Sequence, residues 1–310
     1  MNQMKKHFPD KEKNFLSNLL DFLMAKVLFI CALVSVLSLL LITVYIFVNG
    51  LRLFKFISPQ SFLFGFDWDP VAQKLFGILP MIITSFYVTL GALMISVPLG
   101  IACAVFLAEI ASKKTQKIVR PAVQLLAGIP SVVFGLLGIA LVVPVIQFLT
   151  DTPGLSILAA IIILSIMILP TIISISEDSI RAVPRELRES SYALGTTKWQ
   201  TIYGTVLPAS SSGLITAIVL GLGRAFGEAM AVKMVIGNSQ TMPDFSPQSL
   251  FGLLSLARTL TTNIIGDIEY AEAGAHLDAL FATGSILFIF IVLVNSISYI
   301  FRTRAYGGSK

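Results

Sequence analysis

Two charged side chains, Arg224 and Glu228, stand four residues apart inside an otherwise apolar stretch. A charge near the middle of a bilayer costs at least about 2.5–3.5 kcal/mol, so such residues usually face a partner or an aqueous path. If the span begins at Gly213, Arg224 lies roughly 16 Å into the bilayer. A spacing of four places both side chains on one helical face, where they can pair. The two residues could therefore line a pathway, or form a structural ion pair that locks neighbouring helices.

The chemistry of this pair suits a passing anion better than a reaction. The planar guanidinium of Arg224 matches an oxyanion such as phosphate, and Glu228 would keep the anion from binding too tightly to leave. The sequence holds no glycine-rich loop ending in Lys-Ser or Lys-Thr, and no Ser/His/Asp or Cys/His set stands out. Cys31 and Cys103 lie in apolar runs, which favours packing over a disulfide or a metal site. We expect no catalytic residue, no metal site and no resident cofactor in this chain.

The composition indicates that these residues lie within membrane spans. Of the 310 residues, 55% are hydrophobic and only 13% are charged, whereas a soluble domain carries about 25% charged residues. Crossing the hydrocarbon takes about 20 residues, and the sequence has six runs of that order. They are 27–48, 81–107, 121–148, 155–174, 213–236 and 279–300. We therefore expect an all-α membrane protein with six transmembrane helices.

Three further residues predict local detail within these spans. Gly128 and Pro130 indicate a kink or a close helix contact in the third span. Lys233 lies near the outer end of the fifth span, where its long side chain is expected to reach water.

Lysine and arginine sort strongly between the loops, which predicts the orientation. Only Arg52, Lys55, Lys74 and Arg258 fall in outer segments if the N-terminus is inside. Under the positive-inside rule both termini are then cytoplasmic. We expect cytoplasmic tails at 1–26 and 303–310, a first helix with an outer segment at 27–78, and a core of five helices at 79–302. The basic N-terminal tail is interpreted as a topology signal, with no nucleic-acid partner.

The longest inner loop, at 177–208, predicts two short helices joined by a turn. Pro184 suits a helix start because its missing amide hydrogen would be unpaired there. A helix over 185–194 would end at Gly195, which can adopt the left-handed conformation. Thr197 can cap the second helix. Such a hinged pair could transmit a push from another protein into the spans, or it could lie on the lipid surface as an amphipathic helix.

This loop resembles a motif of ABC importer permeases: Glu-Ala-Ala, three residues, Gly, nine residues, Ile, one residue, Leu-Pro. The matching positions are Glu189, Ser190, Ser191, Gly195, Thr205, Leu207 and Pro208. The two serines differ little in size from alanine, whereas Thr205 in place of Ile is a real departure. In the family the loop docks into a groove on the ATPase subunit. The resemblance thus implies the same contact here for Glu189 and Gly195.

Longer segments resemble the C-type permease of phosphate ABC importers. They are FDWDP at 66–70, FGILP at 76–80, PLGIACAVFLAEIA at 98–111, LLAGIPSVVFGLLG at 125–138, GLGRAFGEAMAVKMVIGN at 221–238 and ARTLT at 257–261. The resemblance implies a type I ABC importer permease fold with a cytoplasmic coupling helix, and a role in transport for Arg224 and Glu228. It also implies three partners: a homologous second permease, a dimer of ATPase subunits that holds ATP-Mg, and an extracytoplasmic phosphate-binding protein.

Other functions remain open at this point. Within the same class the substrate could be another oxyanion, molybdate or sulfate. Outside it, the chain could be an ion-coupled secondary transporter or a membrane scaffold that senses phosphate. No internal repeat is evident, which counts against an inverted-repeat secondary transporter.

Overall fold

The computed structural model describes the backbone of residues 11–307 and the side chains of residues 20–296. The described chain is almost entirely helical, as predicted, and its only extended element is a short hairpin. Two compact units are present, Met1–Asn49 and Gly50–Lys310.

The first unit is formed by α1 (Lys11–Arg52), which contains the whole predicted span 27–48. Residues 11–26 of the predicted tail are therefore helical, and residues 1–10 lie outside the described part. From Leu20 onward the helix exposes apolar side chains all round. A helix that is apolar on every face is expected within a membrane.

The second unit contains the remaining elements, whose bounds follow. Outer elements come first: η1 (Leu53–Lys55), α2 (Pro59–Phe64), β1 (Trp68–Asp69), β2 (Leu75–Phe76), η5 (Pro247–Ser249) and α12 (Leu260–Asp267). The long helices and their extensions are α3 (Leu79–Val105), η2 (Phe106–Ile110), α4 (Lys113–Ala127), α5 (Ser131–Leu137), η3 (Gly138–Val142), α6 (Val143–Thr150), α7 (Ile157–Arg181), α10 (Leu207–Gly227), α11 (Met230–Val235) and α13 (Ala275–Gly307). Between α7 and α10 lie α8 (Arg185–Ala193), α9 (Lys198–Thr201) and η4 (Ile202–Val206). Strands β1 and β2 pair antiparallel, with Trp68 opposite Phe76.

Six helical runs in the described chain are long and apolar enough to cross a membrane, which agrees with the prediction. They are Leu20–Lys55, Leu79–Ile110, Ser131–Thr150, Ile157–Arg181, Lys198–Gly227 and Ala275–Ser296.

The third and fifth runs differ in position from the prediction. The helix expected over 121–148 is interrupted between Ala127 and Ser131, because proline at 130 lacks an amide hydrogen and restricts the residue before it. The kink expected at Gly128 and Pro130 is therefore confirmed. The fifth run was expected over 213–236, but it begins at Lys198 and its helix ends at Gly227.

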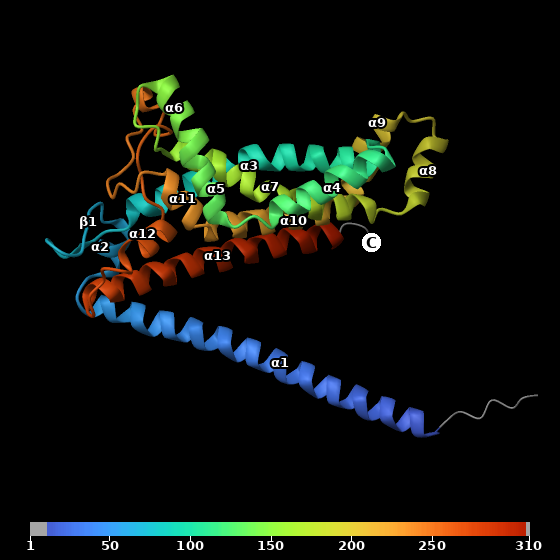
Figure 1. Cartoon of the computed structure of the whole chain (residues 1–310), viewed down its shortest axis with the longest axis horizontal. Coiled ribbons are helices and arrows are strands. Elements are labelled where there is room, and N and C mark those ends of the chain that lie inside the picture. The colour runs from blue at the N-terminus through green and yellow to red at the C-terminus, as the bar shows by residue number, and fades with distance from the viewer. Residues whose placement is uncertain (1–10, 308–310) are drawn as a thin grey trace, which may run out of the picture. The chain divides into compact units, whose positions relative to one another are not determined.

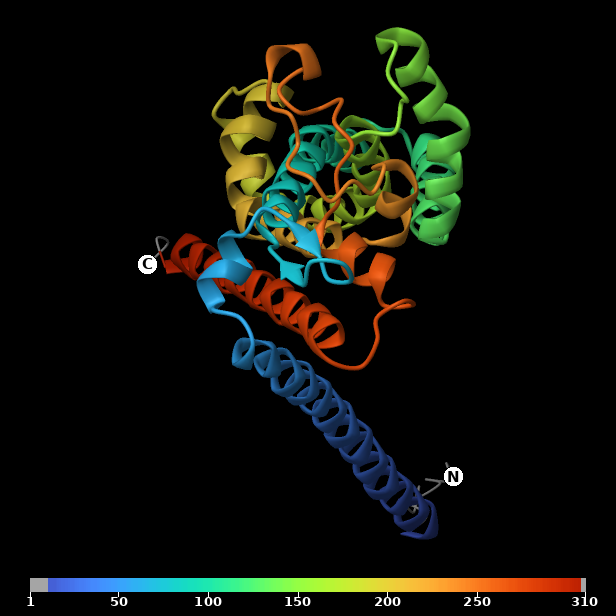
Figure 2. The same cartoon turned by 90° about the vertical axis from the view of Figure 1, so that its left-hand side faces the viewer.

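Helix α7 forms the centre of the second unit. Two thirds of its apolar window is buried inside the unit, against 39% or less for each of the other runs. On one side, Gly91 and Gly100 of α3 lie directly against Ile161 and Ile172 of α7. At these two contacts the residue numbers rise in the same order along both helices, so α3 and α7 run in the same direction. Figure 2 shows them side by side along the bundle axis.

Helix α10 packs against α7 in the opposite direction. Gly213 near the start of α10 meets Ser179 near the end of α7, and Gly221 meets Ile172 further back. The missing side chains of these glycines allow the two backbones to approach closely, as is common between membrane helices.

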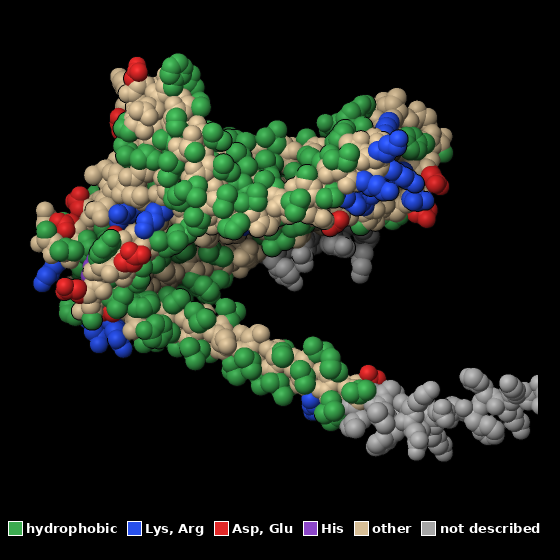
Figure 3. Space-filling model, in the orientation of Figure 1, with side chains coloured by type: hydrophobic (Ala, Val, Ile, Leu, Met, Phe, Trp, Pro, Cys, Tyr) green, Lys and Arg blue, Asp and Glu red, His purple; other side chains and the backbone are tan. Residues whose placement is uncertain are grey.

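The second unit has two distinct ends (Figure 1). One carries α8 and α9, and we call it the α8 end. The opposite end carries β1, α2 and α12, and we call it the hairpin end. Lysine and arginine side chains gather over α4 and α8 at the α8 end, while the middle of the bundle presents mostly hydrophobic side chains (Figure 3).

Candidate functional site

Arg224 lies in the last turn of α10 and is held by α7. One guanidinium nitrogen, Nη1, donates to the hydroxyl of Thr171 at 2.9 Å. Thr171 follows Ile157, the first residue of α7, by about 21 Å of helix, and about 15 Å separate it from Arg181 at the other end. Arg224 is therefore near the middle of the bundle. The predicted start of this span at Gly213 is wrong, since the helical run extends to Lys198 at the α8 end, and the depth of Arg224 in a membrane stays a prediction.

Glu228 does not pair with Arg224 in this structure, so the alternative of a structural ion pair between these two residues is wrong. Helix α10 ends at Gly227, and Glu228 has an extended backbone with ψ of 124°. This change of direction removes Glu228 from the helical face that carries Arg224. The carboxylate instead accepts the backbone amide of Ala231 at 3.0 Å, which caps the start of α11. The carbonyl oxygen of Glu228 also accepts the hydroxyl of Thr261 at 3.0 Å.

A very small cavity beside Glu228 is lined by hydroxyl groups. It holds about 10 Å³, roughly the space of one water molecule. The polar side chains around it are Ser85, Thr89, Glu228, Thr259 and Thr261. An anion as large as phosphate does not fit this cavity in the described conformation, so a pathway through it requires the helices to move.

Two prolines in α3 and α7 lie at the level of Arg224. Pro98 is inside α3 and Pro170 is inside α7. Since Gly100 of α3 meets Ile172 of α7, the two prolines are level with each other, and Pro170 adjoins the Thr171 that binds Arg224. Each proline removes one helical hydrogen bond and weakens the helix at that point.

The break before α5 lies at the same level. Gly138, which directly follows α5, meets Ile163 of α7, and α5 runs alongside α11 with Gly135 against Ala231. Pro130 lies eight residues before Gly138, and Thr171 lies eight residues after Ile163. Both are therefore about equally far along the bundle from the contact between Gly138 and Ile163. Helices α3, α7, α10 and the α4–α5 pair are thus all interrupted or weakened at the depth of Arg224.

The loop predicted to couple to another protein forms the α8 end. Helix α8 spans Arg185–Ala193, within one residue of the predicted 185–194. Gly195 has φ of +82° and open space where a side chain would be, which confirms its predicted left-handed role. Thr197 caps α9 in a capping box with Gln200, as predicted for its hydroxyl. Glu189 and Ser190 are exposed beside them, so another protein can reach this surface.

The remaining motif residues face the bundle and its continuation into α10. Ser191 is buried, and its hydroxyl lies 2.8 Å from that of Thr196. Thr205, which departs from the apolar residue of the family motif, donates to Ser191 at 3.4 Å. Ser191 and Thr205, which both replace an apolar residue of the family motif, therefore contact each other. Leu207 and Pro208 are the first residues of α10, which continues the helical run from η4 without a break.

A buried carboxylate ties α4 to α7 at this end. Glu177 is 6% exposed and accepts hydrogen bonds from Arg120 of α4 at 2.6 Å and from Arg181 at 3.0 Å. The hydrogen bond to this carboxylate raises the pKa of Arg120 above its usual value. The sequence indicates Arg120 and Arg181 only as part of the positive charge on one side of the spans. Glu177, an acid at the end of an apolar run, was the signal that could have indicated their pairing.

The hairpin end is held together by a second set of polar contacts. Asp267 of α12 accepts the indole N–H of Trp68 at 2.7 Å and the Arg258 guanidinium at 2.8 Å. Lys233 donates to the carbonyl of Ile265 in α12 at 3.3 Å, a protein partner that the sequence did not indicate.

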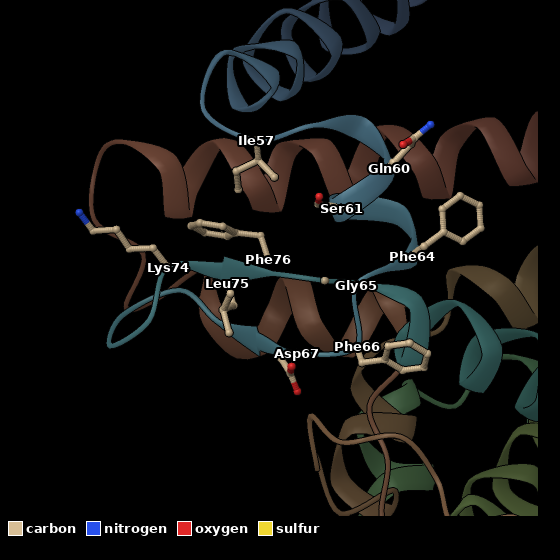
Figure 4. Close-up of a pocket in the computed structure, with 11 residues that line it drawn as sticks. Ile57, Gln60, Ser61, Phe64, Gly65, Phe66, Asp67, Lys74, Leu75 and Phe76 are labelled. Carbon is tan, nitrogen blue, oxygen red and sulfur yellow. The ribbon is translucent and has the colours of Figure 1, made fainter.

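Near the hairpin lies a hollow of about 460 Å³ (Figure 4). Its lining includes Phe64, Phe66, Asp67, Lys74 and Phe76. Phe64 and Lys74 lie towards opposite sides of it in Figure 4. None of the residues predicted to act in transport lines this hollow.

Comparison with known proteins places this geometry in a family. Residues 96–306 match the family model described as "Binding-protein-dependent transport system inner membrane component". The chain is 44% identical over 276 residues to the "Probable ABC transporter permease protein YqgH" of Bacillus subtilis (strain 168), covering 86% of this chain and 87% of the relative. It is 36% identical over 270 residues to the "Phosphate transport system permease protein PstC" of Pasteurella multocida (strain Pm70), covering 79% and 80%.

Solved structures support the fold alone. An inward-facing form of the MetNI methionine ABC transporter superposes with a TM-score of 0.52 at 19% identity, covering 74% of this chain and 94% of the matched chain. The helical arrangement is accordingly that of an ABC importer permease. With six membrane-spanning helices and a family match over most of its length, the chain belongs to the inner membrane components of binding-protein-dependent transport systems.

Proposed function

We propose that this chain is one permease subunit of an ATP-driven importer of inorganic phosphate. The observation that carries the proposal is Arg224, held at mid-bundle by Thr171 at 2.9 Å. A guanidinium has five N–H donors in a planar fork that suits an oxyanion, and this contact engages only one nitrogen. Relatives at 33–37% identity that carry the name of phosphate transport system permease support phosphate as that oxyanion.

The exposed surface of α8 is the proposed contact with an ATPase. Glu189, Ser190 and Gly195 lie on this surface, and a dimer of ATPase subunits would bind it and supply ATP-Mg. A homologous second permease would complete the pathway, and a phosphate-binding protein would deliver the anion at the hairpin end. In this arrangement the α8 end and both termini are cytoplasmic.

Transport would proceed by alternating access. Closure of the ATPase dimer displaces α8, the helices open towards the hairpin end, and the anion reaches the level of Arg224. Release of nucleotide reverses the motion. The weak points at Pro98, Pro130 and Pro170 lie at this level, which suits bending of the helices around the anion.

The test is phosphate uptake into vesicles that contain the whole complex and its binding protein. Arg224→Gln should abolish uptake, because a neutral amide replaces the cation, while the complex still assembles. Lys114→Gln, at an exposed lysine of α4 outside the α8 surface, is the control that also removes one positive charge, and it should transport normally. Near-normal uptake by Arg224→Gln would reject the pathway role.

The same vesicles distinguish phosphate from the other candidate substrates. They also distinguish ATP from an ion gradient as the source of energy. Uptake should require ATP inside the cytoplasmic compartment and persist without an ion gradient. Unlabelled molybdate or sulfate should compete weakly with labelled phosphate. Strong competition by either would make that anion the substrate, and dependence on an ion gradient would exclude the ABC mechanism.

A further inference from the structure

Arg188 of α8 is the most heavily bonded arginine among the described side chains. Its Nη2 atom donates to the carbonyl of Ile180 at 2.8 Å, and its Nη1 atom donates to the carbonyl of Val183. The last carbonyls of a helix have no partner within the helix and carry partial negative charge. Arg188 therefore caps the end of α7 from the neighbouring helix α8.

The same guanidinium reaches a third element. Its Nε and Nη2 atoms donate to one oxygen of Glu109 at 3.1 Å and 2.9 Å. Glu109 lies in η2, the continuation of α3 at the α8 end. Both side chains are largely buried, with 17% of Arg188 and 12% of Glu109 exposed. One residue of α8 thus joins α8 to the ends of both α3 and α7.

A second contact links the end of α3 to the rest of this charged frame. Arg181 donates to the carbonyl of Leu107 at 3.2 Å and also to Glu177. Glu177 in turn binds Arg120 of α4. The α8 end therefore has a continuous polar connection from α8 through α3 and α7 to α4.

The link from α8 to α9 and η4, which continue into α10, is of a different kind. Besides the chain itself, it includes the hydroxyl contacts of Ser191, Thr196, Thr201 and Thr205. Neutral hydroxyl contacts are weaker than charge-assisted bonds. Among the side-chain hydrogen bonds, those from α8 to α3 and α7 are therefore charged, and those from α8 to α9 and η4 are neutral.

We propose that Arg188 and Glu109 form the strut by which movement of α8 is carried into α3. They are positioning residues: neither touches the anion, and both act by fixing the end of α3 to α8. Pro98, the weak point of α3, lies eleven residues before Glu109 along the same helical run. A push at Glu109 therefore acts on the segment between Glu109 and Pro98. The inference rests on the proposed function, because it requires that α8 is moved by an ATPase.

The experiment measures phosphate uptake and ATP hydrolysis together in vesicles with the whole complex and binding protein. Glu109→Gln removes the negative charge from α3 and leaves the contacts of Arg188 with α7 in place. We expect binding-protein-stimulated ATP hydrolysis to remain within about twofold of normal while uptake per ATP falls by about tenfold, as for loss of one partner from a buried charged pair. Lys114→Gln, at an exposed lysine of α4, should leave uptake per ATP unchanged.

A chemical link provides a second and independent measurement. Cys31 and Cys103 are first replaced by serine, and Glu109→Cys and Arg188→Cys are then combined. Without a linker, uptake per ATP should be low. Joining the two thiols with a short bifunctional thiosulfonate reagent should restore it, because the strut is mechanical. A role in stability alone would lower the amount of complex without changing uptake per ATP.

Two outcomes would overturn the strut. One is normal uptake per ATP in Glu109→Gln. The other is a fall of uptake and of ATP hydrolysis in the same proportion, in Glu109→Gln and in the unlinked double-cysteine variant. Failure of the proposed function looks different, since the unaltered complex itself would then take up no phosphate. In that case the strut is tested with the oxyanion that the unaltered complex does carry. The measurement is whether Glu109→Gln changes the amount of ATP hydrolysed for each molecule of that anion transported.

Discussion

Thr171 decides how the Arg224 cation near the middle of the bundle is presented. A free arginine side chain has many rotamers, and fixing it costs conformational entropy. The 2.9 Å contact with Thr171 fixes one nitrogen of Arg224 on α7. Glu228 is occupied with the amide of Ala231 and does not compete for the guanidinium. Arg224 is thereby held in place without being neutralised by a direct ion pair.

Replacement of Thr171 by valine tests this arrangement. The shape of the side chain is retained, but the acceptor of Arg224 is lost. A hydrogen bond to a charged group is worth about 1.5–3 kcal/mol, so the phosphate concentration for half-maximal uptake should rise by about tenfold. Thr171→Ser keeps the hydroxyl and should behave normally. Equal concentration dependence in all three proteins would show that Thr171 does not position Arg224.

At the scale of elements, glycine sets how closely α7 and α10 approach. A Cβ atom on Gly213 would lie 2.4 Å from Cβ of Ser179, far inside van der Waals contact. By contrast, nothing lies within 4 Å of the corresponding position on Gly223 in the same helix. The first glycine is therefore required by packing and the second is not.

Gly213→Ala should destabilise the permease, because overpacking of a close contact costs about 1–3 kcal/mol. The thermal unfolding midpoint of the purified complex measures this loss. Ser179→Gly in the same chain removes the colliding atoms and should restore most of the midpoint. Gly223→Ala is the matched control and should leave the midpoint unchanged or raised, since alanine favours helix. Equal effects of the two alanines would disprove the packing argument.

The accuracy of the element boundaries follows from how local their causes are. The bounds of α8 and the start of α9 were predicted closely because Pro184, Gly195 and Thr197 act on residues next to them. The break after Gly227 was missed because apolar residues continue on both sides of it, as they would along one span. The cap that Glu228 places on α11 became visible only in three dimensions.

At the scale of the whole molecule, the distribution of charge indicates which end faces the cytoplasm. Basic side chains gather at the α8 end (Figure 3), and positive charge is retained on the cytoplasmic side. The proposed ATPase contact and the Arg188–Glu109 strut lie at this same end. The orientation therefore decides whether an ATPase can reach α8 at all.

Cysteine labelling measures the orientation directly. After Cys31 and Cys103 are replaced, Ser190→Cys on α8 should react with a membrane-impermeant maleimide only from the cytoplasmic side. Glu269→Cys, exposed after α12, should react only from the other side. Labelling of Ser190→Cys from outside would contradict the orientation and with it the ATPase contact.

The sequence by itself predicted the six apolar spans, the two short helices and turn at 177–208, and Arg224 as a cation within an apolar run. These features depend on composition, local capping and the rarity of charge in apolar segments, all of which are written along the chain. Only the tertiary structure decided the partners. Thr171 binds Arg224 across 53 residues, Glu109 binds Arg188 across 79, and Glu228 leaves the helix on which it was expected to pair. Such contacts are set by how helices pack, and a hydroxyl or carboxylate carries no mark in the sequence of which distant helix it will meet.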